Sequence, residues 1–172
     1  MRDQAFIAEH RGGILTKEQH RQLVLWACMC VENTFHLLSL TIGNRLSDAI
    51  KVAKDWTEDN ASVGDARKAS VEAIAVANEL NNPIEIAIAR SVGHAVATAH
   101  MADHSLRAAE YAMKAIKLAG KVVEEERNWQ VKKLPPEIAD IVLTVKDGPV
   151  KLSYESANKR TSPRKTNIDC NC

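Results

Sequence analysis

Three of the six histidines, His94, His100 and His104, fall within one short segment whose background is almost entirely alanine, valine and glycine. Helical zinc sites place two histidines four residues apart on one face, and His100 and His104 have that spacing if a helix runs unbroken through Asp103. His94 lies about 120° away around such a helix, so it joins the pair only if the chain breaks. Asp103 or Glu110 would complete a site only if the chain turns at Asp103. The candidate metal ligands are therefore His94, His100, Asp103 and His104.

The same histidines also fit a structural role, which the sequence favours. Two imidazole nitrogens do not make a metal site, and the ring nitrogens of a histidine can instead hydrogen-bond a neighbouring helix. We therefore expect His100 to bond a facing helix and His104 to lie near a helix N-terminus, and we predict no metal and no cofactor.

Gly93 lies on the stripe of small and apolar residues that runs along the histidine segment. At a helical repeat, this stripe contains Ile86, Ala89, Gly93, Val96, Ala97 and His100. A glycine inside a helix costs about 1 kcal/mol relative to alanine unless another backbone comes close. The stripe therefore predicts a tight helix crossing at Gly93.

The segment Gly93-His94-Ala95-Val96-Ala97-Thr98-Ala99-His100-Met101-Ala102-Asp103-His104, followed by Ala108-Ala109-Glu110-Tyr111-Ala112, resembles the signature of the immunity-five-like family of bacterial helical immunity proteins. Two flanking pieces support the resemblance: Leu25-Trp26-Ala27-Cys28 with Glu32, and Glu126-Arg127-Asn128-Trp129-Gln130 before Leu134-Pro135. The signature positions are Trp26, Gly93, His94, His100, Asp103, His104, Tyr111 and Trp129, within a span of about residues 20 to 146. The resemblance implies a cytoplasmic protein that protects its cell from a toxin by binding it, and it brings no catalytic residue.

Sequence motifs for other chemistries are missing. The chain contains no phosphate-binding glycine loop, dinucleotide fingerprint, hydrolase elbow or H-E-x-x-H motif. Cys28 and Cys30 point about 160° apart on a helix, so they cannot bind one metal together, and we expect both to be reduced. Cys170 and Cys172 resemble the prenylated end of small GTPases, but the chain has no GTPase motif, so we do not expect lipidation and expect an exposed pair to be open to oxidation.

The sequence predicts that these residues are positioned by an all-α fold, a single domain of about six helices over residues 1–146. Strand patterns are scarce before residue 140. The predicted helices run from a Thr16 cap to about Leu38, from Leu46 to Trp56 after a loop at Thr41 to Asn44, from a Ser62 cap to Asn81, from Pro83 to about Met101, and from an Asp103 cap to about Val131. The first of these is apolar on most sides and should be central.

The last part of the chain changes character. Ile138 to Val145 is apolar and suits a helix or a strand equally well. Residues 147–172 are polar and aperiodic, with five basic and three acidic side chains, so we predict a flexible basic tail.

Charge and composition exclude several classes of protein. The chain has 172 residues, a net charge of +1 and no apolar run long enough to span a bilayer, which predicts a cytoplasmic protein without a membrane partner. Neither a basic face nor a strongly acidic surface is evident, so no nucleic acid is expected as a partner. The acidic stretches Asp55 to Asp59 and Glu124 to Glu126 are the candidates for meeting a basic toxin, although each also fits a solvated helix end.

Together these observations favour an immunity protein that neutralises a cognate protein toxin by direct binding, without catalysis. Two alternatives stay open: a metal-dependent helical-bundle enzyme centred on His94, His100 and His104, and a structural helical protein that works as a homo-oligomer.

Overall fold

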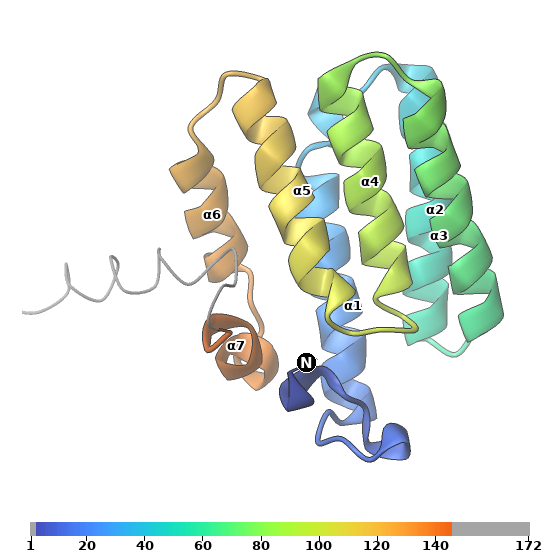
Figure 1. The fold of residues 1–172 in the computed structure, drawn as a ribbon, viewed down its shortest axis with the longest axis vertical. Helices are drawn as coiled ribbons and strands as arrows, with labels where there is room; N and C mark the ends of the chain where they lie inside the picture. Colours follow the sequence, from blue (N-terminus) through green and yellow to red (C-terminus); the bar gives the residue numbers. More distant parts are fainter. Residues whose placement is uncertain (1–2, 146–172) are drawn as a thin grey trace, which may run out of the picture.

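The computed structural model describes residues 3–145, and in this range the fold is all-α in a single domain, as predicted (Figure 1). Seven α-helices are present: α1 (Lys17–Glu32), α2 (Leu40–Thr57), α3 (Val63–Glu79), α4 (Pro83–Ala97), α5 (His104–Leu118), α6 (Val123–Lys132) and α7 (Pro136–Leu143). Three short 3-10 turns accompany them: η1 (Gln4–Phe6), η2 (Glu9–Arg11) and η3 (Phe35–Leu37). The predicted tail, with Cys170 and Cys172, lies outside the described residues.

Helix starts follow the capping chemistry of the sequence. Thr16 accepts a hydrogen bond from the Gln19 backbone N–H while the Gln19 side chain bonds the Thr16 N–H, and Ser62 and Asp65 form the same reciprocal box before α3. These two boxes satisfy backbone donors that the first helical turn leaves without partners. The caps predicted at Thr16 and Ser62 are therefore confirmed, as is the start of α4 at Pro83.

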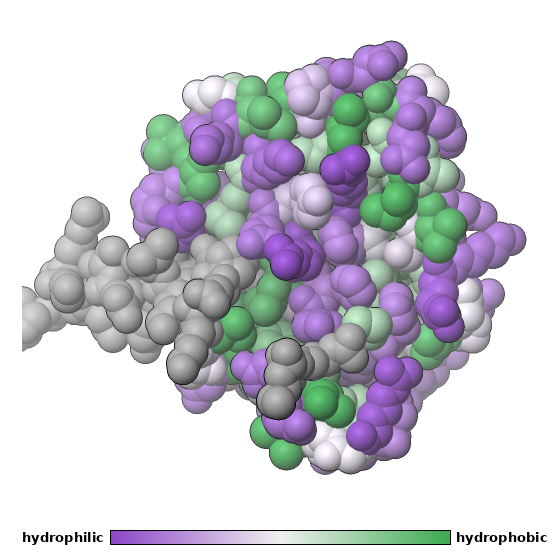
Figure 2. All heavy atoms as spheres, in the orientation of Figure 1, coloured by the Kyte–Doolittle hydropathy of each residue, from purple (hydrophilic) through white to green (hydrophobic). Residues whose placement is uncertain are grey.

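The helices alternate in direction along the chain, with α1 running behind α4 and α5 (Figure 1). Helix α4 packs most closely on α3 and α5, and α1 contacts α2, α4, α5 and α7. Helix α1 is therefore the central element that its apolar sequence predicts. On the face shown in Figure 2, hydrophobic residues lie scattered among hydrophilic ones instead of forming one broad patch.

Two clusters of buried side chains form the core. The first cluster joins α1 to α2, α3, α4 and α5 and is rich in alanine, which lets the helices approach closely. The second cluster joins the N-terminal segment, α1, α5 and α7 around the buried Trp26. Cys28 belongs to the first cluster and Cys30 to the second, which confirms that the two thiols point apart, and neither is in a disulfide.

The crossing of α3 and α4 is tight at Gly93, as its place on the apolar stripe predicts. A Cβ atom at Gly93 would lie 2.5 Å from Ile74 Cδ1, 2.7 Å from Ile74 Cγ1 and 3.4 Å from the Ser70 carbonyl oxygen. The Ser70 hydroxyl also donates a 2.9 Å hydrogen bond to the Gly93 carbonyl. The glycine therefore allows both the close approach and this bond between helices.

Several predicted helix limits are wrong. Helix α1 ends at Glu32, because the chain tightens into η3, where the buried Thr34 hydroxyl bonds the Val31 carbonyl. Helix α2 already begins at Leu40, so the predicted loop at Thr41 to Asn44 is helical. The Glu85 carboxylate of α4 accepts the Ser39 N–H just before α2 and helps to fix this start.

The predicted long helix from Asp103 to Val131 is two helices, and this division accounts for seven helices instead of about six. Gly120 adopts a left-handed φ of 71°, the Gly120 N–H bonds the Lys117 carbonyl, and the Lys121 N–H bonds the Ile116 carbonyl. These two bonds form a Schellman motif, which ends α5. At the other end, Asp103 occupies the cap position of α5 but its side chain makes no capping hydrogen bond.

The remaining apolar segment is helix α7, so the strand alternative for Ile138 to Val145 is wrong. Ile138 and Val142 are fully buried in the second cluster. Within residues 3–145, no helix is long and apolar enough to cross a membrane.

Candidate functional site

The turn between α4 and α5 brings His94 and His104 into direct contact. Six residues separate the end of α4 at Ala97 from the start of α5 at His104. The Nδ1 atoms of His94 and His104 lie 3.0 Å apart. The sequence placed His94 away from the other two histidines unless the chain breaks, and the chain does break here. A hydrogen bond between two imidazole nitrogens needs one protonated donor and one unprotonated acceptor. The pair therefore holds at least one neutral ring.

Tyr111 of α5 extends this pair into a small aromatic stack. Its ring lies nearly parallel to that of His94, with 5.4 Å between centroids and 14° between planes. Burial lowers the pKa of His94 from 6.5 to about 4, and the charges of His104 and Arg107 add to this effect. His94 is therefore neutral at pH 7, as its bond to a second imidazole requires.

His100 occupies a different position from the one predicted. It lies in the connection after α4, with its ring 5.5 Å from that of His104. Its Nδ1 atom is buried and has no hydrogen-bond partner among the described residues, so the expected bond from His100 to a facing helix is wrong. Burial lowers the pKa of His100 as well, with further lowering by the charges of His104, Arg67 and Arg11.

His20 makes the bond that was expected of His100. Its Nε2 atom lies 2.6 Å from the Thr98 carbonyl oxygen in the α4–α5 connection, and its ring packs on Trp56 at 5.0 Å between centroids. The sequence analysis missed His20, although it shares one face of α1 with the buried residues Leu23 and Ala27. That position on the apolar face was the available signal.

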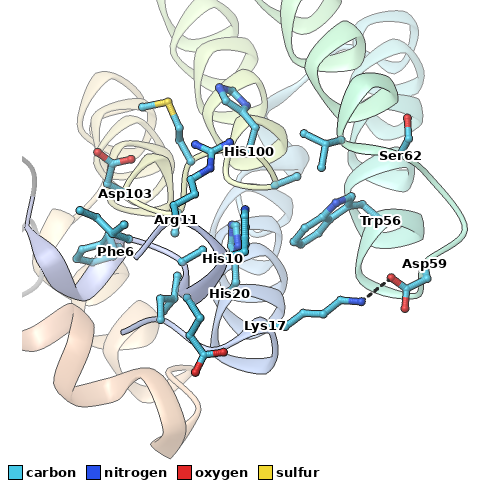
Figure 3. Close-up of a pocket in the computed structure, with 18 of the residues that line it drawn as sticks. Phe6, His10, Arg11, Lys17, His20, Trp56, Asp59, Ser62, His100 and Asp103 are labelled. Carbon is cyan, nitrogen blue, oxygen red and sulfur yellow. Dashed lines mark hydrogen bonds and ion pairs between the residues drawn. The ribbon is translucent and has the colours of Figure 1, made fainter. Parts of the chain in front are cut away.

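A cavity of about 530 Å³ opens at this end of the bundle (Figure 3). Its walls come from η1 and η2, the start of α1, the end of α2, the start of α3 and the α4–α5 connection. Phe6, Arg11, His20, Trp56 and His100 are among the lining residues. Sequence spacing could not reveal this cavity, because its lining comes from three separate stretches of the chain, residues 6–20, 56–63 and 99–103.

The candidate metal ligands are brought together only in part. Among residues 3–145, no three histidine, cysteine, aspartate or glutamate side chains are arranged to hold a metal ion. His94 and His104 are bonded to each other, and Glu110 pairs with Arg107 at 2.7 Å. The geometry of these residues thus offers hydrogen bonds and ring stacking.

The other signature positions lie away from the histidines. Trp26 is buried in the second cluster and donates a 3.0 Å hydrogen bond to the Gln130 carbonyl of α6. Trp129 is half-buried on α6, where the ammonium group of Lys133 lies 5.7 Å from its ring centroid. Both tryptophans therefore help to position α6 and its end.

Four of the six carboxylates in the two acidic stretches have ion-pair or buried hydrogen-bond partners within the chain. Asp59 pairs with Lys17 at 3.0 Å and also with Arg21, and these contacts lower the pKa of Asp59. Asp55 pairs with Lys51 at 2.7 Å. In the second stretch, Glu126 is buried and accepts hydrogen bonds from Asn33 at 2.7 Å and from Gln130 at 3.0 Å, while Glu124 pairs with Arg127 at 2.8 Å. These contacts support the solvated or structural explanation for both stretches.

Comparison with known proteins identifies the family. No curated protein and no solved structure matches the chain significantly. The model of the Imm-5 like putative immunity protein family matches residues 13–137, from just before α1 to the first turn of α7. This match covers most of the chain and includes the histidine cluster, the Gly93 crossing and Trp26. The chain therefore belongs to the Imm-5 like immunity protein family.

Proposed function

We propose that this protein neutralises a bacterial toxin by binding it directly, in the cytoplasm of the cell it protects. The observation that carries the proposal is family membership over residues 13–137. An immunity protein of this kind acts stoichiometrically, so it needs a stable surface and no turnover.

The geometry of the signature residues supports binding without catalysis. His94 and His104 are hydrogen-bonded to each other, the Tyr111 ring stacks on His94, and Gly93 serves the contact between α3 and α4. A general acid or base must lie within hydrogen-bond reach of a substrate. The Nδ1 atom of His94 is instead engaged in the hydrogen bond with His104. These contacts favour a role in holding the α4–α5 end of the bundle in shape.

The test is co-expression with the product of an adjacent toxin gene. We expect growth to be restored in proportion to the dose of this protein, and the two proteins to purify as a stoichiometric complex. Protection at far less than one copy per toxin molecule would contradict neutralisation by binding.

Alanine variants separate binding from the alternative of a metal enzyme. Replacing His94 or His104 removes one partner of a part-buried bond, which costs about 1 to 3 kcal/mol, so any loss of protection should follow loss of stability. His100→Ala is the sharper case, because no hydrogen bond is lost. A stable, metal-depleted and non-protective His100→Ala protein would overturn the proposal in favour of the enzyme.

A further inference from the structure

The cavity at the α4–α5 end has the size of a small-ligand site. Its volume of about 530 Å³ lies within the range of roughly 300 to 1,000 Å³ that is usual for such sites. Pockets of this kind combine apolar walls with a few convergent polar groups, and the polar groups set which ligand is bound.

Apolar side chains line the cavity on two opposite sides (Figure 3). Phe6 and Leu15 are buried on the N-terminal side, and the Trp56 ring faces the cavity from α2 (Figure 3). The Trp56 ring packs on the His20 ring, whose Nε2 atom lies 2.6 Å from the Thr98 carbonyl oxygen. These apolar surfaces are suited to an aromatic or aliphatic group.

Arg11 and His100 add polar groups that have no hydrogen-bond or ion-pair partner among the side chains of residues 3–145. Figure 3 shows the Arg11 side chain extended toward His100. Arg11 forms no ion pair with any residue between positions 3 and 145, and the buried Nδ1 atom of His100 has no hydrogen-bond partner in that range. Arg11 also lowers the pKa of His100, which places its positive charge close to the ring. A neutral imidazole still donates one N–H, so Arg11 and His100 can both donate to one acceptor group.

The remaining charges on the cavity wall limit the charge of that acceptor. Lys17 is already paired with Asp59, and the lining also includes Glu9 and Asp103. Three carboxylates around the cavity repel a doubly charged phosphate more strongly than a singly charged group. A planar carboxylate also matches the fork of a guanidinium.

We propose that this cavity binds a carboxylate carried on an aromatic or aliphatic group. Arg11 and His100 donate hydrogen bonds to the carboxylate, and Trp56 and Phe6 contact the apolar group. Either a free organic acid or the C-terminal residue of a polypeptide supplies this chemistry. The assignment stands independently of toxin neutralisation, because it rests on the cavity alone.

The experiment is calorimetric titration of the full-length protein with two pairs of probes. Phenylacetate and its amide represent the free acid, and N-acetyl-Gly-Gly-Phe and its C-terminal amide represent a polypeptide end. At least one acid should bind about tenfold more tightly than its amide, a difference of about 1.4 kcal/mol. The acid that binds more tightly identifies the source of the carboxylate.

Variants locate the binding in the cavity. Arg11→Gln and His100→Gln should each weaken the preferred acid by about tenfold. The control is Arg45→Gln, since Arg45 pairs with Glu79 on the exposed surface of α2 and α3 and should leave affinity unchanged within twofold. Arg11 is exposed in η2, so its replacement should also leave the melting temperature unchanged.

Three results would overturn the assignment: no measurable binding of either acid, equal binding of acid and amide, or equal loss of affinity in Arg11→Gln and Arg45→Gln. The comparison of acid with amide uses the unaltered protein, so it decides the matter even if a variant fails to fold. If the unaltered protein binds neither acid yet still protects against the toxin, the cavity assignment is refuted and the proposed function is untouched.

Discussion

Replacing Gly93 with alanine tests the tight crossing of α3 and α4 most directly. The new Cβ atom would meet Ile74 at 2.5 and 2.7 Å, whereas carbon atoms pack best at about 3.5 to 4.0 Å. Because both Cγ1 and Cδ1 of Ile74 are too close, rotation of the terminal methyl group alone does not relieve the clash. Either Ile74 changes its rotamer or the two helices move apart.

Two opposing effects set the size of the change. Overpacking costs about 1 to 3 kcal/mol, while alanine gains about 1 kcal/mol over glycine in a helix interior. We therefore expect Gly93→Ala to lower the free energy of unfolding by about 1 kcal/mol and the melting temperature by about 2 to 4 °C. Gly93→Leu should lower the melting temperature by several degrees more, because the larger side chain cannot fit between the helices.

Gly43 provides a matched control within the same protein. It also lies inside a helix, α2, but an added Cβ atom there meets nothing within 4 Å. Gly43→Ala should therefore stabilise the protein by up to about 1 kcal/mol. Urea unfolding followed by circular dichroism at 222 nm measures both variants, and a double-mutant cycle with Ile74→Ala isolates the clash.

The cycle also gives the refuting result. If Ile74 is the obstacle, Ile74→Ala should cost less in the Gly93→Ala background than in the unaltered protein. Additive effects, or a Gly93→Ala variant as stabilised as Gly43→Ala, would show that the crossing leaves room for a methyl group.

Three further predictions concern a turn, a titration and two thiols. Gly120→Ala should lower the melting temperature by a few degrees without a steric clash, because only the left-handed φ of 71° resists a side chain, at a cost of about 1 kcal/mol; an unchanged melting temperature would mean that the turn is not strained by alanine. The pKa of His94 is about 4 in the folded protein against 6.5 when unperturbed, so its contribution to stability is complete above pH 6.5 and is lost as pH falls toward 4; urea midpoints should fall less steeply over this interval in His94→Gln, and parallel pH profiles would contradict the assignment. Burial raises the pKa of Cys28 to about 12 and that of Cys30 well above 9. In a variant with serine at positions 170 and 172, both thiols should therefore resist a thiol reagent until urea unfolds the protein. Rapid labelling of the native variant would show that α1 is not packed as described.

The parts of the fold that sequence predicts are those governed by local chemistry. Thr16 and Ser62 lie next to the residues that complete their capping boxes, and Pro83 suits only a first helical turn. Gly93 stands out because the residues next to it on the stripe, Ala89, Val96 and Ala97, are all apolar. Each of these features needs only a few adjacent residues to be recognised.

What sequence did not predict depends on where the chain turns. The break at Gly120 had a signal, since a glycine after an amphipathic run commonly ends a helix, but the apolar repeat continued past it. The pairing of His94 with His104 required the exact end of α4, which helical spacing cannot provide. The cavity required the N-terminal segment to lie against the α2–α3 turn and the α4–α5 connection, and no local pattern encodes that arrangement.

The two core clusters imply an order of assembly during synthesis. All members of the first cluster lie between Val24 and Ala115, whereas the second extends to Val142. The hydrogen bond from Trp26 to the Gln130 carbonyl spans 104 positions, and the bond from Gln19 to the Glu137 carbonyl spans 118, so both form only late in synthesis. Since chains emerge at about 5 to 20 residues per second, the first cluster can close seconds before the second. During that interval, α1 presents one covered face and one open apolar face, so a chain truncated before α7 would leave Trp26 accessible to chaperones or to other unfinished chains.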